Sequence, residues 1–277
     1  MSTQTIDTPV TSHRLPTAPL RLGLVQGVRH SLALAGRNVT KFVRSPISVV
    51  DVVLTPVISL LMFVYLFGGA IAGGDTDGYV QMIVPGVMVM AVFQASIGIG
   101  VSLTTDASTG MFDRFRSMPI GRSVPLIGAV LADVVRYVIC LATLLILAYI
   151  MGYRIDTNPI ATLAAIAFLV GFALSFAWMS VFLGMLVKSP TTVQGLMTIV
   201  VLPLTFASNV FVPTQTMPGW LQAWSSVNPV SLVADVSRGL LNGGDVAGPA
   251  LGSLAWMAGM IVVFFPLAMR AYRRNNG

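Results

Sequence analysis

Charged residues are scarce in this chain. Only 9% of its 277 residues are Asp, Glu, Lys or Arg, whereas soluble domains carry about 25%. Glu is absent, so all 10 acidic residues are Asp. Hydrophobic residues make up 55% of the chain, and the mean hydropathy is +0.84. A soluble fold could not cover its surface with so few charges, and this composition predicts a polytopic membrane protein.

Reactive side chains are equally scarce. Cys140 is the only cysteine, which excludes a disulfide framework and a cysteine metal site within the chain. His13 and His30 are the only histidines, too few for a Ser-His-Asp triad elsewhere or an HExxH motif. Neither lysine, Lys41 or Lys188, stands in the G-x-x-x-x-G-K-[ST] pattern of a P-loop. We expect no catalytic residue, metal site or cofactor in this chain, so energy from ATP would have to come through a partner.

Long apolar runs with few or no charges predict six membrane-spanning helices within a domain of residues 46–270. A span needs roughly 20 mostly apolar residues, and lipid favours helices because their backbone hydrogen bonds are internal. The run from 189 to 234 is too long for one span, and we expect it to hold the fifth span and a further outer segment. The six runs are 47–68, 80–103, 124–153, 160–187, 189–234 and 246–269.

Most Lys and Arg residues fall on one predicted side. The positive-inside rule then places both termini in the cytoplasm of a bacterial plasma membrane, with residues 69–79 and 212–245 outside. The net charge of +6 is therefore a topology signal, and we expect no nucleic-acid partner. The cytoplasmic basic residues lie in the N-terminal segment, in residues 106–122, at Lys188 and in the tail 271–277 with the adjoining Arg270.

The N-terminal segment divides into two parts. Residues 1–19 are rich in Thr, Ser and Pro and predict a disordered tail. Residues 20–45 predict an amphipathic helix on the inner membrane surface, in contact with lipids. The alternative is a helix that packs on the cytoplasmic ends of the bundle. Its apolar face would consist of Val25, Val28, Leu32, Ala35, Val39 and Phe42.

A charged island separates the second and third predicted spans. Its apolar residues recur at helical spacing, which favours a short helix that inserts into a partner. The alternative is an ordinary solvated loop. The candidate residues are Asp106, Met111, Phe112, Asp113, Arg114, Phe115, Arg116 and Arg122.

Two further charges, Asp133 and Arg136, lie three residues apart and can pair on one helix face. A charge inside hydrocarbon is a functional candidate. The alternative is that the third span starts late and leaves this pair at its cytoplasmic end.

The outer segment after the fifth span contains Trp220 and Trp224, which would share one face at the aromatic belt. Asn228-Pro229 is typical of a helix start, and Asn242 followed by two glycines is typical of a stop. We expect two short helices that dip into the outer leaflet and shape the mouth of a pathway. The alternative is a folded cap without a role in transport.

No single predicted span carries a polar stripe, so a transport path would have to form at an interface. Five aromatic or polar residues are candidates for lining it, and ordinary helix packing is the alternative for each. They are Tyr65, Phe93, Gln94, Phe206 and Asn209.

Three stretches resemble one family. TGMFDRFRSMPIGRS at 109–123 is similar to the cytoplasmic loop of type-2 ABC exporter permeases, particularly the daunorubicin-resistance branch. LADVVRY at 131–137 resembles the start of that branch's third span. SNVFVPTQTMPGWLQAWSSVNPVSLVADVSRGLLNGG at 208–244 resembles its outer segment. An acidic residue often precedes the loop's glycine in these permeases, and here Asp106 would have to take that part.

The resemblance implies a permease subunit whose loop helix contacts a separate nucleotide-binding subunit, which holds ATP and Mg. It also implies two permeases, as a homodimer or a related heterodimer, that export a hydrophobic or amphipathic cargo such as a drug, an antibiotic or a lipid. A secondary transporter, a membrane scaffold or a membrane enzyme remains as an alternative. A secondary transporter would normally place coupling charges near the midplane.

Overall fold

The computed structural model describes residues 24–68, 76–109 and 124–275, and every regular element in these ranges is helical. The predicted all-α class is confirmed. The helices of the first half are α1 (Leu24–Val43), α2 (Pro46–Met62), the π-helix η1 (Phe63–Phe67), α4 (Thr76–Ala95), α5 (Ile97–Ser108) and α7 (Val124–Ile150). Those of the second half are α8 (Pro159–Leu186), α9 (Pro190–Phe206), the short 3₁₀-helix η2 (Thr214–Thr216), α10 (Gly219–Ser225), α11 (Pro229–Asn242) and α12 (Ala247–Asn275).

In the described ranges, five helical stretches are long and apolar enough to cross a membrane, which makes the chain a polytopic membrane protein. They cover residues 49–66, 78–108, 126–150, 159–186 and 247–274. The predicted fifth span corresponds to α9, an apolar helix of 17 residues. At 1.5 Å per residue it rises about 26 Å, slightly less than the ~30 Å hydrocarbon core. The count of six spans therefore stays a prediction that depends on α9.

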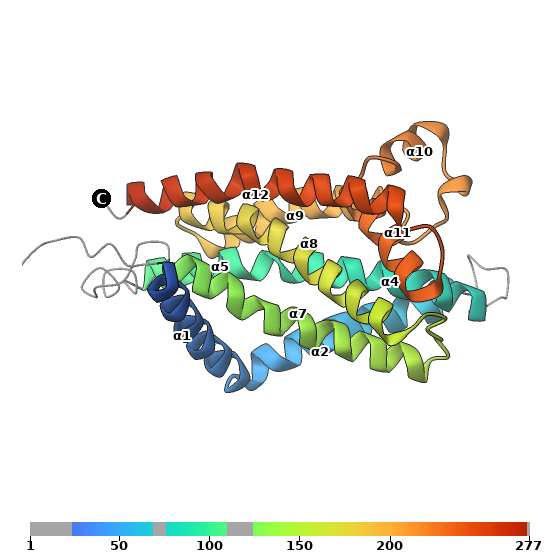
Figure 1. Ribbon diagram of the computed structural model, residues 1–277, viewed down its shortest axis with the longest axis horizontal. Helices are drawn as coiled ribbons and strands as arrows, with labels where there is room; N and C mark the ends of the chain where they lie inside the picture. The colour runs from blue at the N-terminus through green and yellow to red at the C-terminus, as the bar shows by residue number, and fades with distance from the viewer. Residues whose placement is uncertain (1–23, 69–75, 110–123, 276–277) are drawn as a thin grey trace, which may run out of the picture.

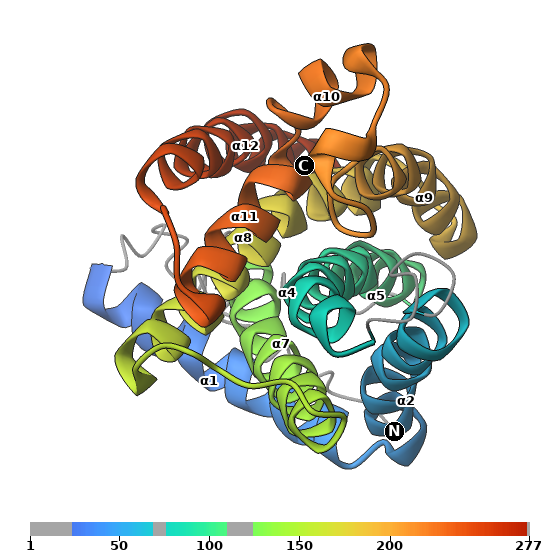
Figure 2. The same ribbon diagram turned by 90° about the vertical axis from the view of Figure 1, so that its right-hand side faces the viewer.

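The second span occupies the centre of the bundle. In an apolar 18-residue window of the stretch 78–108, 78% of the residues are buried inside the protein, against 22% in the window of the first span and 11% in that of the last. In Figure 2, α4 and α5 lie between α2 and α9 on one side and α7 and α8 on the other. The first and last spans lie at the periphery and expose apolar side chains, as lipid contact requires.

The bundle has two distinct ends (Figure 1). At one end, here called the α1 end, lie α1, the end of α5 and the C-terminus of α12. At the other, the α11 end, lie α10, α11 and the start of α4. Helix α1 runs obliquely across its end of the bundle and packs against α7 and α2. The sharp corner after α1 falls at Ser45 and Pro46, where proline takes the first turn of α2.

A break at Ser96 divides the central span into α4 and α5. The Ser180 hydroxyl of α8 inserts there. It donates to the Ile97 carbonyl at 2.9 Å and accepts from the Gly100 N–H at 3.1 Å. A side chain that enters the backbone ladder is one of the recognised causes of a helix kink.

Close approach of α5 and α8 makes this insertion possible. A Cβ on Gly184 would lie 2.6 Å from the Gly100 carbonyl oxygen, so the crossing tolerates no larger residue. Small residues at such crossings let the two helix backbones come into contact. This close packing stabilises helix association in a membrane, where the hydrophobic effect does not drive helices together.

Candidate functional site

A cavity of about 340 Å³ opens at the α1 end between α1, α2, α5 and α7. We call it the vestibule. Its polar wall includes Asn38, Asp51, Asp106, Asp133 and Arg136. Helix α7 begins at Val124, so Asp133 and Arg136 lie in its third and fourth turns, on the side of the α1 end. The sequence pattern placed these two on one helix face, and they do pair, with Arg136 Nη1 3.2 Å from Asp133 Oδ1.

Arg136 contacts three different helices. Its guanidinium pairs with Asp133 within α7 and lies over the ring of Phe42 in α1, with Cζ 5.6 Å from the ring centroid. On the α5 side it packs against Gly98, where a Cβ would lie 3.2 Å from both terminal nitrogens. A glycine is therefore the residue that leaves room for the guanidinium beside the break at Ser96.

A second cavity, of about 360 Å³, is lined by residues of α2, α4, α5, α7 and α9. We call it the groove. Helices α2 and α9 form its flanks and α4 lies between them (Figure 2). Its wall carries polar side chains among apolar ones: Asp51, Thr55, Ser59, Gln94, Gln194 and Thr198.

These polar residues correct the expectation that no span carries a polar stripe. Asp51, Thr55 and Ser59 follow one another at intervals of four on α2, so they share one helix face. The Thr55 hydroxyl donates to Asp51 Oδ1 at 3.2 Å. Gln194 and Thr198 repeat the same interval on α9. The expectation was wrong because it considered charges and overlooked the spacing of hydroxyl and amide side chains.

The vestibule and the groove meet at Arg136. Both cavities are lined by Asp51, Gly98, Val101 and Arg136. These four residues therefore lie at the boundary between the two cavities.

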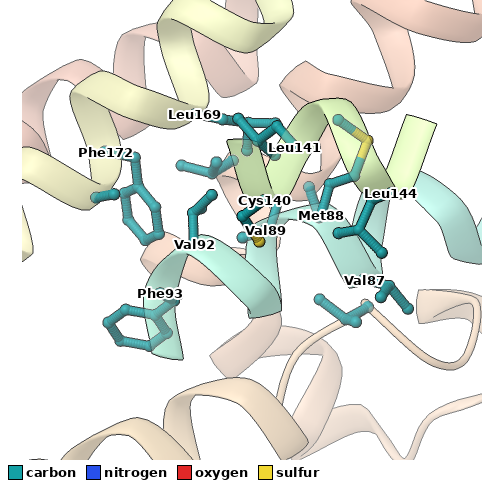
Figure 3. Packing of buried hydrophobic residues seen from close by; sticks show 14 of the residues in the cluster. Val87, Met88, Val89, Val92, Phe93, Cys140, Leu141, Leu144, Leu169 and Phe172 are labelled. Carbon is teal, nitrogen blue, oxygen red and sulfur yellow. The ribbon is translucent and has the colours of Figure 1, made fainter. Parts of the chain in front are cut away.

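The five predicted path-lining residues separate into different environments. Gln94 lines the groove. Tyr65 and Phe206 are 70% and 61% exposed on the surface that lipid or another protein would cover. Phe93 lines neither cavity, since it is fully buried and packs edge-on against Phe176. Figure 3 shows Phe93 on α4 with Phe172 of α8 as a neighbour in the buried cluster.

Asn209, the last of the five, belongs to a polar network at the α11 end. Its side-chain amide donates to Asp235 Oδ1 at 2.8 Å, and its backbone carbonyl accepts from Arg238 Nη2 at 2.6 Å. Arg238 also donates to Asp235 at 3.0 Å and to the Met82 carbonyl of α4 at 3.3 Å. Burial lowers the pKa of Arg238, and the neighbouring Asp235 opposes that shift. The network fastens α11 to the central span.

Asn228 joins the end of α9 to the start of α11. Its amide nitrogen donates to the carbonyls of Leu204 and Ala207 at 2.8 and 3.0 Å, which would otherwise be unsatisfied at a helix end. Its Oδ1 accepts from the Val230 N–H at 2.9 Å as an N-cap. Pro229 takes the first position of α11 and is buried. Helix α11 has the bounds that these residues and the two glycines after Asn242 predict.

Two of the four tryptophans, Trp220 and Trp224, are exposed on α10 by 74% and 44%. A third, Trp256 of α12, donates its indole N–H to the Val227 carbonyl at 2.9 Å. Nearby, Tyr153 donates to Asn242 Oδ1, and burial raises the pKa of Tyr153. Aromatic side chains gather at the α11 end, which is the composition of a membrane–water interface.

Most of the charged island lies outside the described residues. Met111, Phe112, Asp113, Arg114, Phe115, Arg116 and Arg122 all fall in the range 110–123, for which the structure describes no placement. Asp106 is described and lines the vestibule close to the end of α5. In the described part of the chain no three His, Cys, Asp or Glu side chains gather as metal ligands.

Sequence reasoning missed Phe42, Gly98, Gln194 and Thr198 as parts of this site. The polar pair of α9 and the stripe of α2 carry a usable signal, namely polar residues four apart inside apolar runs. Gly98 and Phe42 carry none, because their role depends on helices that are far apart in the sequence.

Comparisons with known proteins agree with this architecture. Residues 29–242 match the family model described as ABC-2 type transporter. The chain is 42% identical over 240 residues to a daunorubicin resistance ABC transporter permease protein of Streptomyces coeruleorubidus, covering 87% of this chain and 84% of that protein. It is 27% identical over 272 residues to a probable doxorubicin resistance ABC transporter permease protein of Mycobacterium tuberculosis, covering 96% and 98%. An inner membrane transport permease of Escherichia coli is 25% identical over 236 residues, covering 82% and 90%.

Proposed function

Because the chain belongs to the ABC-2 type transporter family, it is the permease subunit of an ABC exporter in a plasma membrane, and we propose that it exports a hydrophobic or amphipathic drug-like cargo. Two relatives are named for resistance to daunorubicin and doxorubicin, and these names support a drug-like cargo. An ABC ATPase is its partner, and we assign ATP and Mg to that subunit.

The groove is the observation that carries the proposal. It combines apolar walls with hydroxyl and amide groups from α2, α4 and α9. An amphipathic molecule needs both, since its apolar part avoids water while each buried polar group requires a hydrogen-bond partner.

A second permease would complete the path. The flanks of the groove expose apolar residues such as Ile58 and Met62 of α2, each 47% exposed, and Ile199 of α9, 69% exposed. We propose that α2 and α9 of one subunit face their counterparts in a second copy or a related chain, so that two grooves enclose the cargo. Membrane lipids cover α12.

The α1 end is proposed to be cytoplasmic, with both termini on that side. The basic residues of α1 and of the C-terminal end of α12 support this orientation through the positive-inside rule. With this orientation the end of α5, which is followed in the sequence by the segment up to Arg122, lies on the cytoplasmic side, where the ATPase binds. This segment is the proposed site of coupling.

The test uses inside-out vesicles that contain the full chain and its ATPase, with ATP-dependent uptake of a fluorescent anthracycline as the measurement. Thr198→Trp fills the groove and is expected to reduce uptake at least tenfold while ATPase binding persists. Val262→Trp, on the lipid-facing side of α12 where Val262 is 71% exposed, is the matched control. Equal uptake by the two variants would show that the groove does not carry cargo.

Dimer formation is tested separately. In a Cys140→Ala background, Ile58→Cys on one subunit and Ile199→Cys on another should crosslink to a species of twice the mass. Crosslinks that form only within one chain, or that ignore ATP, would exclude a path at this junction.

A further inference from the structure

We infer that the vestibule binds the cationic group of the cargo between the Asp133 carboxylate and the Phe42 ring, in a place that Arg136 occupies when cargo is absent. The inference rests on the proposed export function and specifies the charge of its cargo. Arg136 thus acts as an internal competitor, which a cargo cation must displace to pass from the vestibule into the groove.

The surroundings of Arg136 are those of an organic-cation site. A carboxylate oxygen lies 3.2 Å from its Nη1, and an aromatic ring faces its Cζ with the centroid at 5.6 Å. Proteins bind ammonium and guanidinium groups with this combination of a negative charge and an aromatic face. The remaining side is backbone at Gly98, where a Cβ would crowd the guanidinium. The cation is therefore held by groups that would serve a cargo cation equally well.

The ion pair is incompletely satisfied. Asp133 is 6% exposed, yet its Oδ2 has no hydrogen-bond partner, and neither has Arg136 Nε. Only one contact joins the two side chains, whereas arginine and carboxylate commonly form two parallel bonds. A buried carboxylate oxygen without a donor is costly to maintain. A cargo with several N–H donors, or a compact ammonium, would satisfy it better than Arg136 does.

A second carboxylate lines the junction. Asp51 lines both cavities together with Arg136, and its described contact is the Thr55 hydroxyl. Asp133 pairs with Arg136 directly, whereas Asp51 borders the same two cavities from α2. When a cargo cation pairs with Asp133, Asp51 is the carboxylate toward which the released Arg136 turns.

This exchange gives the path a selective entrance. The cargo cation pairs with the Asp133 carboxylate, and Arg136 turns toward Asp51 on α2. The boundary between the vestibule and the groove then opens. A neutral molecule has no means to release Arg136. The groove beyond carries uncharged polar groups and apolar walls, which suits the apolar body that follows the cation.

The experiment compares two probes that differ in one charge. The full-length permease is placed in phosphatidylcholine nanodiscs, with empty discs as background. One dansyl-alkyl probe ends in a primary ammonium group, which has three N–H donors, and the other ends in the isosteric methyl group. Titration by dansyl fluorescence should show the cation binding at least about tenfold more tightly, as expected for pairing with a partly desolvated carboxylate.

Variants separate recognition from structure. Asp133→Asn should abolish the preference for the cation, and Phe42→Leu should reduce it several-fold. Arg136→Gln should strengthen binding of the cation, because the competitor is removed while Asp133 remains. A purely structural pair predicts the opposite sign, since loss of Arg136 would then disturb the site. Asp156→Asn replaces an exposed aspartate whose backbone N–H donates to the Leu241 carbonyl of α11; it is the control and should leave both affinities unchanged.

The outcomes are distinguishable from those of the proposed function. Equal binding and equal export of the two probes would overturn the inference and leave the exporter intact. A preference for the cation without ATP-driven export of either probe would support the site and contradict the export function. Weaker cation binding in Arg136→Gln, with an unchanged unfolding temperature, would also overturn the exchange.

Discussion

Replacing Arg238 by methionine should destabilise the protein more than replacing its ion-pair partner Asp235 by asparagine. Arg238→Met keeps the length of the side chain and removes its donors. Those donors reach three backbone carbonyls, of Met82, Asn209 and Val210, besides the Asp235 carboxylate.

The magnitude follows from exposure and distance. The Asp235 side chain is 40% exposed and that of Arg238 is 19% exposed, so solvent screens their attraction and the pair contributes at most about 1 kcal/mol. The bond to the Asn209 carbonyl is short, at 2.6 Å, and a hydrogen bond from a charged group contributes about 1.5–3 kcal/mol. The two carbonyls at 3.3 Å add less. We expect a loss of about 3–4 kcal/mol for Arg238→Met, counting the carbonyls left unpaired, and under 1 kcal/mol for Asp235→Asn.

Cys140 supplies the assay. It is the only cysteine and is 3% exposed, so a maleimide dye that fluoresces on reaction with its thiol reports unfolding. At about 2–4 °C per kcal/mol for a chain of this size, Arg238→Met should lower the midpoint by roughly 10 °C. Arg154→Met, an exposed arginine that also donates to backbone carbonyls, is the control and should shift it little. Equal losses for Arg238→Met and Asp235→Asn would show that the ion pair, and not the carbonyl contacts, holds α11 in place.

Three further predictions concern other parts of the molecule. Gly184→Ala should lower the same midpoint by the equivalent of about 1–3 kcal/mol, because its methyl group would clash with the α5 backbone, whereas Gly195→Ala, with open space around it, should be neutral or slightly stabilising; equal shifts would contradict the close crossing. Phe115→Ala should weaken ATPase docking by about 2 kcal/mol, the typical loss for a buried interface aromatic, while unfolding stays unchanged; undiminished pull-down of the ATPase would leave this segment a solvated loop. For topology, Asp75→Cys should react with an impermeant maleimide added outside intact cells and Arg273→Cys should not, in a Cys140→Ala background; the reverse pattern would invert the proposed orientation.

The fold was predictable wherever the signal is local. Long apolar runs located the spans, and Asn228 with Pro229 located the start of α11 because capping depends on adjacent residues. The length of α9 was less predictable, since the uncharged run around it continues into η2 and α10. Charge alone does not show where such a helix ends.

The candidate site was predictable only in part. Asp133 and Arg136 stood out because they lie on one helix and in an apolar context. Their neighbours Phe42, Asp51 and Gly98 come from three other helices, and only packing brings them together. Phe93 illustrates the converse: its aromatic character suited a path, but the tight contacts of α4 with α8 place it in the core.

Because of the break at Ser96, the second span consists of two helical segments that can bend relative to each other. In a continuous helix, a tilt of the end of α5 would move the whole span, including Gly86, which packs against Val210. This contact is close, since a Cβ on Gly86 would lie 2.8 Å from the Val210 backbone. The break at Ser96, where the Ser96 and Ser180 hydroxyls bond to backbone groups of α4 and α5, would instead convert that tilt into a local bend. A force that the ATPase applies to the segment after Asp106 would then move α5 beside Arg136. The part of the span nearest α11, which is α4, would stay in place.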